Sequence, residues 1–183
     1  MLEALPAGGL VRENGELKKV PTAWKTAEVP FADKTRHCVS IPWGDVSTAY
    51  HSTKIPNIVV YMALSARAAR TLQLAEPLLG LLALPAVRRA AGLVIDRVGL
   101  GPKEEERARG RSHLWGRVRD SGGREVSGTL ETPEGYSLTA TTAVECAERV
   151  VAGRVGAGTQ TPSLAFGAGY IGEFPGCELR VNA

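Results

Sequence analysis

The sequence predicts an α+β fold, with a mixed, mostly antiparallel sheet covered by helices. Runs of β-branched and aromatic residues bounded by turn residues recur near residues 36, 58, 114 and 126, which is typical of strands. Apolar residues spaced three and four apart occur near residues 65–98 and 138–152, the period of a helix that buries one face. We expect one domain over residues 1–183, a length that a single hydrophobic core can serve.

The composition is ordinary for a globular domain. Hydrophobic residues make up 44% of the chain and charged residues 22%, which is enough apolar material for a core. The net charge of +3 is too small to indicate nucleic-acid binding, so no nucleic acid is expected as a partner. Cys38, Cys146 and Cys177 form no CxxC pair, which indicates reduced thiols and a cytoplasmic location. The first residues show no secretory signal.

Residues 1–20 predict a small hairpin. Asn14-Gly15 is a signal for a type I′ turn, and residues 10–12 and 17–20 flank it as strands. Gly8-Gly9 is not a dinucleotide fingerprint, because no GxGxxG, preceding apolar strand or well-placed acidic residue accompanies it. We therefore assign no cofactor-binding residue to this chain, and no cofactor is expected to bind it alone.

Residues 36–62 predict two strands around a short polar helix. The first strand, over residues 36–41, ends at Pro42, which has no backbone donor. Asp45 is expected to cap a helix from about Val46 to Ser52. The β-branched run at residues 58–61 predicts the second, buried strand.

This polar helix carries the first candidate site. It lies between two strands, at the end of a sheet, where α/β proteins usually place ligands. The substrate-binding candidates here are Asp45, Thr48 and His51. His51 could act as a general base near Asp45 if both face one pocket. Helix capping and a solvated helix face are the structural alternative for these side chains.

Residues 64–99 predict a helical segment. Pro77 and Gly80 are expected to interrupt it, and the apolar run at residues 78–87 is about half of the ~20 residues that cross a bilayer. The second part is amphipathic, and its apolar stripe consists of Val87, Ala90, Ala91, Val94, Ile95 and Val98. Core packing is one interpretation of the stripe. The other is an interfacial helix that lies on a membrane with Arg88 and Arg89 beside it.

Residues 112–131 predict a hairpin with one buried face. The buried face is expected to consist of Leu114, Val118, Val126 and Leu130. The other face presents Trp115 beside arginines. That face suits either stacking with a nucleotide or a solvated sheet whose tryptophan is half-covered by a partner domain.

The stretch after the hairpin predicts a helix over about residues 138–152, with Ser137 or Thr139 as its cap. The expected buried stripe is Ala140, Ala143, Val144, Ala147, Val150 and Val151. Tyr136 and Thr139 stand at the helix entrance, where backbone donors and hydroxyls could meet an anionic or carbonyl group. They complete the substrate-binding candidates, with structural capping as the alternative.

No motif assigns catalysis to this chain alone. GxSxG and HExxH are absent, so the catalytic residues stay unassigned. His37 and Cys38 are adjacent in a predicted strand and point to opposite faces, so no metal site is expected there.

Three phrases of the sequence resemble the second half of the saccharopine dehydrogenase-like oxidoreductases, a group that includes the trans-acting enoyl reductases. In chain order they are IPWGDVSTAYHSTKIPNIVVYM, TPEGYSLTATTAVECAERVVAG and TPSLAFGAGYI. Gly169 stands where this group commonly has an acidic residue, so no role is assigned to that position.

The resemblance implies an NAD(P)-dependent oxidoreductase in two parts. A Rossmann domain comes first and binds NAD(P); the second domain covers the nicotinamide, shapes the substrate pocket and often self-associates. This chain resembles that second, C-terminal half, with residues 1–20 as a remnant hairpin and the N-terminal Rossmann domain absent. The implied partners are the missing Rossmann domain or a partner chain, a second copy in a homodimer, and a small-molecule or lipid-like substrate. Because hydride transfer belongs to the cofactor, no dehydrogenation by this chain alone is expected.

The alternative from a different class is a non-catalytic module. It would dock on another protein or on a membrane through the amphipathic helices at residues 72–98. The oxidoreductase interpretation requires an exposed apolar patch for the Rossmann domain. The docking interpretation requires lipid binding that depends on Arg88 and Arg89.

Overall fold

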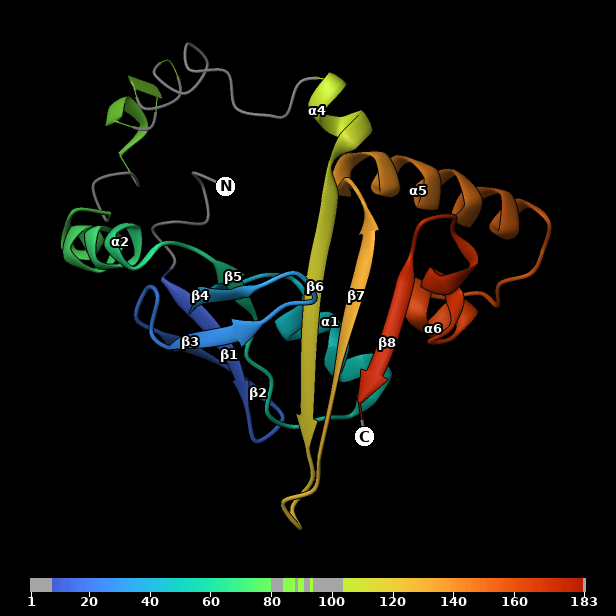
Figure 1. Ribbon diagram of the computed structural model, residues 1–183, viewed down its shortest axis with the longest axis horizontal. Coiled ribbons are helices and arrows are strands. Elements are labelled where there is room, and N and C mark those ends of the chain that lie inside the picture. Colours follow the sequence, from blue (N-terminus) through green and yellow to red (C-terminus); the bar gives the residue numbers. More distant parts are fainter. Residues whose placement is uncertain (1–7, 80–83, 88, 91–92, 94–103, 183) are drawn as a thin grey trace. The chain divides into compact units, whose positions relative to one another are not determined.

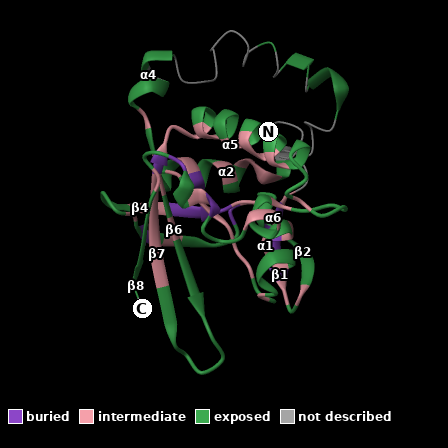
Figure 2. Cartoon of the chain, turned by 90° about the vertical axis from the view of Figure 1, so that its right-hand side faces the viewer, coloured by how far each residue is buried: buried purple, intermediate pink, exposed green. Residues whose placement is uncertain are grey.

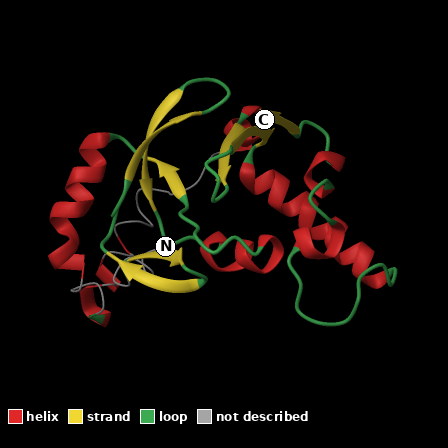
Figure 3. Cartoon of the chain, turned by 90° about the horizontal axis from the view of Figure 1, so that it is seen from below, coloured by secondary structure: helices red, strands yellow, loops and turns green. Residues whose placement is uncertain are grey.

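The structure is a computed structural model that describes residues 8–79, 84–87, 89–90, 93 and 104–182 (Figure 1). The chain was predicted to form one domain, whereas its contacts divide it into two compact units. Unit 1 consists of Met1–Val29 and Arg36–Gly101, and unit 2 of Pro30–Thr35 and Pro102–Ala183. The described residues contain helices and antiparallel sheets, which confirms the α+β class (Figure 3).

Unit 1 opens with the predicted hairpin. Strands β1 (Gly9–Glu13) and β2 (Glu16–Val20) pair antiparallel, with Gly9 opposite Val20. Asn14 has φ 52° and Gly15 has φ 85°, and the type I′ turn needs this left-handed backbone at both central residues. The local Asn-Gly signal was therefore sufficient to place the turn.

The second sheet has the order β3-β4-β5, from β3 (Thr26–Pro30), β4 (Thr35–Ser40) and β5 (Tyr61–Ala63). The strand expected at residues 36–41 is confirmed as β4. The strand expected at residues 58–61 is wrong, since β5 begins only at Tyr61. Ile58 instead forms an isolated bridge with Arg12, with both backbone hydrogen bonds at 3.0 Å. Ile58 therefore pairs with the first hairpin, whereas the Val60 carbonyl accepts a hydrogen bond from the N–H of Ile41, just after β4, at 2.9 Å.

Two helices complete the described part of unit 1. Helix α1 (Asp45–Thr53) starts after Gly44, without a side-chain cap, so the prediction of Asp45 as the cap is wrong. Asp45 is instead the first helical residue. Helix α2 (Ala66–Leu79) continues through Pro77, so the predicted interruption at that residue is also wrong. Pro77 lies in the last turn, where its missing donor costs a single hydrogen bond.

The core of unit 1 lies between the second sheet and α2. Ala23, Val39 and Ala69 are at most 2% exposed, and Ile41, Leu64 and Leu72 pack around them. Most of the second amphipathic stripe, including Val94, Ile95 and Val98, lies outside the described residues. None of the helices in the described stretches has the length and hydropathy needed to cross a membrane.

Unit 2 contains the predicted long hairpin. Strands β6 (Arg111–Arg119), β7 (Glu125–Pro133) and β8 (Glu178–Asn182) form an antiparallel sheet with β7 in the centre. The prediction of a single sheet is wrong, because the segments near residues 36 and 58 belong to unit 1 and those near 114 and 126 to this sheet. The helical elements are α4 (Glu104–Arg109), α5 (Gly135–Val151), α6 (Pro162–Phe166) and a 3₁₀ turn, η3 (Tyr170–Glu173).

Two predicted burial patterns in unit 2 are wrong (Figure 2). The hairpin face expected in the core is exposed, with Leu114 at 48% and Val118 at 47%. The stripe of α5 expected to be buried is also exposed, with Val144 at 60% and Val151 at 89%. Both elements have an apolar side, but the described part of unit 2 packs α5 through its opposite side.

Candidate functional site

The predicted site residues fall into two groups, one in each unit. Asp45, Thr48 and His51 lie on α1 of unit 1, and Tyr136 and Thr139 lie at the start of α5 in unit 2. Each group therefore shares a helix.

The three candidates on α1 are all exposed to solvent. Thr48 Oγ1 donates to the Gly44 carbonyl at 3.2 Å, and His51 meets the ring of Tyr50 edge-on, with centroids 6.0 Å apart. The buried side of the helix is carried by Val46, which is fully buried. The candidates thus form a solvated polar surface on α1.

Arg12 anchors this helix to the first hairpin, and sequence reasoning missed it. Its side chain is buried at 7% exposure. Nε donates to the Val46 carbonyl at 3.0 Å and Nη2 to the Ser47 carbonyl at 3.4 Å, while Nη1 donates to the Gly15 carbonyl. The guanidinium also lies 4.4 Å from the ring centroid of Tyr50. No pattern in the sequence marks an arginine in a short hairpin as buried.

The start of α5 is capped by Glu134, so the predicted cap at Ser137 or Thr139 is wrong. Glu134 Oε2 accepts hydrogen bonds from the backbone N–H of Tyr136 at 3.0 Å and of Ser137 at 3.1 Å. The hydrogen bond from Tyr136 is the largest cause that holds the pKa of the Glu134 carboxyl below its usual value, and the bond from Ser137 also lowers it. An anionic ligand at this helix end would therefore have to displace a carboxylate that is already bound there.

Tyr136 and Thr139 nevertheless remain exposed at this helix end. The Tyr136 side chain is 67% exposed. Thr139 is exposed too, although its Oγ1 donates to the Gly135 carbonyl at 2.7 Å. An aromatic ring and a hydroxyl beside a capped helix end suit contact with a neutral, partly apolar ligand better than with an anion.

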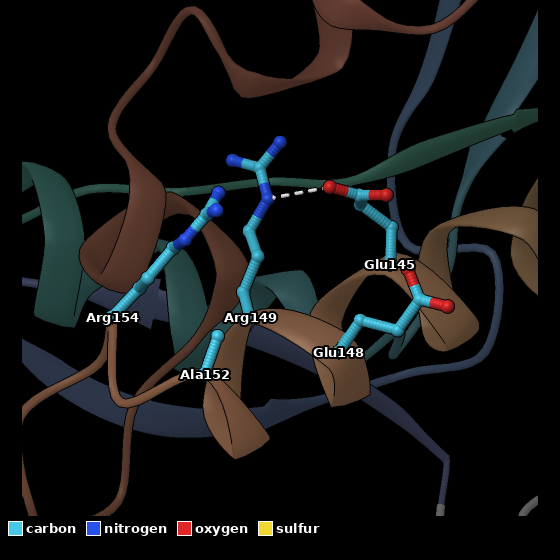
Figure 4. Close-up of a pocket in the computed structure, with 5 residues that line it drawn as sticks. All are labelled: Glu145, Glu148, Arg149, Ala152 and Arg154. Atoms are coloured by element: carbon cyan, nitrogen blue, oxygen red, sulfur yellow. Dashed lines mark hydrogen bonds and ion pairs between the residues drawn. The ribbon is translucent and has the colours of Figure 1, made fainter.

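A charged hollow lies at the other end of α5 (Figure 4). It has a volume of about 260 Å³ and is lined by Glu145, Glu148, Arg149, Ala152 and Arg154. Arg149 Nε donates to Glu145 Oε1 at 2.8 Å, and its Nη2 donates to Glu173. The hydrogen bond to Glu173 is the largest cause that raises the pKa of the Arg149 guanidinium above its usual value, and the hydrogen bond to Glu145 is the second largest. The Glu145–Arg149 pair has the four-residue spacing of side chains that meet on a helix, whereas nothing in the sequence indicated Glu173.

Arg149 also holds an aromatic cluster under this hollow. Its guanidinium lies 5.1 Å from the ring centroid of Phe166 and 4.8 Å from that of Tyr170. Tyr170 is 6% exposed, and its Oη lies 3.2 Å from Cys146 Sγ and donates to the Thr142 carbonyl at 3.4 Å. Burial, the largest cause, raises the pKa of Tyr170 to about 12. The cluster therefore joins α5 to α6 and η3 as a structural unit.

The described residues give little support for a metal site or for a nucleophilic cysteine. No group of three or more His, Cys, Asp or Glu side chains in the described ranges could hold a metal ion. Burial raises the pKa of the Cys38 thiol and of the Cys177 thiol, which opposes thiolate formation. In the hollow, Arg149 is paired with Glu145, and also with Glu173 outside the lining residues.

Unit 2 has an apolar sheet face, which we call the open sheet face and define as Leu114, Val118, Val126, Leu130, Leu179 and Val181. Register places Leu130 between Leu114 and Leu179, and Val118 opposite Val126. Leu179 is 55% and Val181 62% exposed. With strands rising ~3.4 Å per residue and lying ~4.8 Å apart, the face covers on the order of 300 Å². Apolar patches of this size on a folded surface commonly mark interaction sites.

Comparison of the chain with protein-family models, with curated proteins and with solved structures finds no match.

Proposed function

We propose that this chain is the C-terminal, substrate-shaping part of a saccharopine dehydrogenase-like NAD(P)-dependent oxidoreductase, similar to the trans-acting enoyl reductases. A nucleotide-binding domain supplied by a partner docks on the open sheet face and brings NAD(P). The cofactor delivers hydride, and this chain covers the reaction site and orients a small or lipid-like substrate in the cytoplasm. The three phrases of the sequence support the proposal, and the open sheet face is the observation that carries it.

The open sheet face supports docking on energetic grounds. Burying about 300 Å² of apolar surface at ~25 cal/mol per Å² contributes on the order of 7 kcal/mol before the costs of association. Leu114 and Val126 stay 48% and 38% exposed, so this free energy is not used within the described part of the chain. A partner domain that covers the face would recover it.

In this proposal the polar candidate residues contact the substrate. Asp45, Thr48 and His51 present solvated polar groups on α1, and Tyr136 and Thr139 do so at the start of α5. With the helix end capped by Glu134, the ligand portion that meets Tyr136 is neutral or apolar. An enoyl thioester with a long acyl chain has this chemistry.

Activity of the native assembly tests the proposal. The purified chain alone should show no NADPH binding in calorimetry at cofactor concentrations up to about 1 mM. The assembly recovered from source cells through a tag on this chain should oxidise NADPH with an enoyl thioester. Val126→Glu, on the open sheet face, should remove this activity from the recovered assembly, because it places a charge in the docking surface. Tight NADPH binding by the chain alone, or a native assembly without such activity, would overturn the proposal.

A membrane-docking module is the second candidate, and exposed leucines in unit 1 favour it. Leu74 is 81%, Leu84 52% and Leu93 61% exposed, and Arg67 and Arg70 are exposed on α2. Leucines flanked by arginines suit an anionic membrane surface. The chain would then float with vesicles of anionic lipid, and a variant carrying Arg88→Glu and Arg89→Glu would not. Absence of flotation at low salt would exclude this candidate.

A further inference from the structure

A histidine of unit 2 faces two carboxylates on one side of its sheet. His113 on β6 lies directly opposite Glu131 on β7, so both side chains point to the same side of the sheet. Its Nδ1 lies 3.9 Å from Glu131 Oε2 and also 3.9 Å from Oδ1 of Asp33, in the loop between β3 and β4. We call His113, Asp33 and Glu131 the histidine cluster.

The loop that carries Asp33 belongs to unit 2 by its contacts. Unit 2 includes Pro30–Thr35, whereas Val29 and Arg36, the residues on either side, belong to unit 1. The histidine cluster therefore lies within unit 2. It is a place where the β3–β4 loop meets the sheet of that unit.

The His113 ring lacks a hydrogen bond that its surroundings offer. Nδ1 is buried and, within the described residues, has no hydrogen-bond partner. Both distances of 3.9 Å exceed hydrogen-bond length, and an ionised carboxylate can only accept a hydrogen bond. A buried nitrogen that turns its lone pair toward two carboxylates is unfavourable. Nδ1 is therefore satisfied here only when it carries a hydrogen and moves toward a carboxylate.

The neighbouring charged groups leave this role to His113. On β6, Arg111 Nε lies 3.9 Å from Glu131 Oε1, which is the carboxylate oxygen on the other side from His113. On β8, Glu178 lies opposite Glu131 and pairs with Arg180 at 3.0 Å. Arg111 thus compensates one oxygen of Glu131, and Oε2 is left turned to His113.

Solvent has access to the His113 ring, so the ring can exchange protons. The side chain is 21% exposed although Nδ1 is buried, so other atoms of the ring reach solvent. Histidine side chains change their charge between about pH 5 and 8, where Asp and Glu are ordinarily ionised. A change of pH within this range therefore acts on the histidine of the cluster rather than on its carboxylates.

We propose that the histidine cluster is a pH-sensitive clasp on the β3–β4 loop. When His113 is protonated, Nδ1 donates toward the two carboxylates, and the positive charge of the ring attracts Asp33 and holds the loop on the sheet. When the ring is neutral, this attraction between charges is lost and the loop is held only by its other contacts. The clasp is closed at about pH 5.5 and open at about pH 8. The inference does not rest on the proposed function, because it uses neither the open sheet face nor the substrate candidates.

A double-mutant cycle measured at two pH values tests the clasp. His113→Gln removes the charge of the ring, and Asp33→Asn removes the carboxylate of the loop with little change in size. At about pH 5.5 the folding equilibrium constants from urea unfolding should show a coupling of about two- to fivefold between the two changes, as for other partly exposed ion pairs. At about pH 8 the coupling should vanish. Asp33 makes a further interaction, and the cycle separates its contribution from the coupling with His113.

A second histidine provides the matched control. His51 is exposed on α1 of unit 1, and the cycle of His51→Gln with Asp33→Asn should show no coupling at either pH. A merely structural role of His113 would give the same coupling at both pH values. That result, the absence of coupling at the lower pH, or an equal coupling with His51→Gln would each overturn the inference. The NADPH test of the proposed function depends on none of these outcomes.

Discussion

Arg12 shows how a single side chain can organise a unit. The residue is 7% exposed, and its guanidinium donates to the carbonyls of Val46, Ser47 and Gly15. Its backbone pairs with Ile58 through two hydrogen bonds of 3.0 Å. One residue thus joins the first hairpin, helix α1 and the segment that leads into β5.

Replacing Arg12 should destabilise unit 1. Arg12→Met keeps much of the apolar stem but removes the side-chain hydrogen bonds, each with a net contribution of about 1 kcal/mol. We expect the free energy of unfolding in urea to fall by about 2 kcal/mol. Lys18→Met, an exposed change in the same hairpin, should cost less than ~1 kcal/mol. Equal losses for the two variants would show that the buried contacts of Arg12 contribute little.

Tyr170 should make stability depend on alkaline pH. Burial raises its pKa to about 12 in the folded chain, above the usual value of 10.0. The folded state therefore holds this proton more tightly, so the stabilisation is complete below pH 10 and is lost as the pH rises through 12. Urea unfolding of the wild type should show this fall. Tyr170→Phe should show a shallower one, and identical slopes would contradict the assignment.

At the scale of elements, helix α5 is placed by polar contacts. Glu134 caps its first turn, and Arg149, Cys146 and Thr142 bind the cluster around Tyr170. The exposed valines of the helix, Val144, Val150 and Val151, take part in none of these contacts. A helix whose polar side faces its own unit has its apolar side available for another molecule.

Removing the cap should give a pH-dependent loss of stability. The backbone bonds to Tyr136 and Ser137 lower the pKa of Glu134, so its contribution is present above the usual value of 4.5 and is lost as the pH falls through the lowered value. Glu134→Gln should therefore lower the unfolding midpoint at pH 7. The difference from wild type should vanish in strong acid. A difference that persists unchanged at low pH would show that the charge is irrelevant to the cap.

At the scale of the molecule, both units have a core, and unit 2 also carries two exposed apolar surfaces. These are the open sheet face and the side of α5 that carries Val144, Val150 and Val151. Val39 in unit 1, by contrast, is 1% exposed. A polar substitution of valine should therefore cost much more stability at Val39 than on the open sheet face.

Polar substitution on the open sheet face should leave stability intact. Val118→Thr with Val126→Thr keeps shape and strand propensity at exposed positions, so the free energy of unfolding should change by less than ~0.5 kcal/mol. Binding of the dye ANS, which reports exposed apolar surface, should fall. Val39→Thr, which buries a hydroxyl, should cost about 2 kcal/mol. A large loss in the double variant would show that this face is packed.

The local elements of this protein follow from local sequence. Asn14-Gly15 determined the turn of the first hairpin, and the alternation around Ser121-Gly122-Gly123 determined the second one. These signals act through neighbouring backbone angles and the side-chain period, so they need no distant partner. The candidate residues on α1 and α5 were likewise placed on helices because helix periodicity is local.

The tertiary structure alone decided which surfaces are covered. The sequence determined that α5 and the long hairpin each have an apolar side, but Val144 and Val118 are exposed, and the buried arginine of unit 1 had no signal at all. The predicted cap, Ser137 or Thr139, differs from the observed cap, Glu134. These side chains compete for the same backbone N–H donors at the start of α5. Periodicity specifies that an element has two unlike sides. Which side is buried depends on the free energy of packing against groups distant in the chain, or in another molecule.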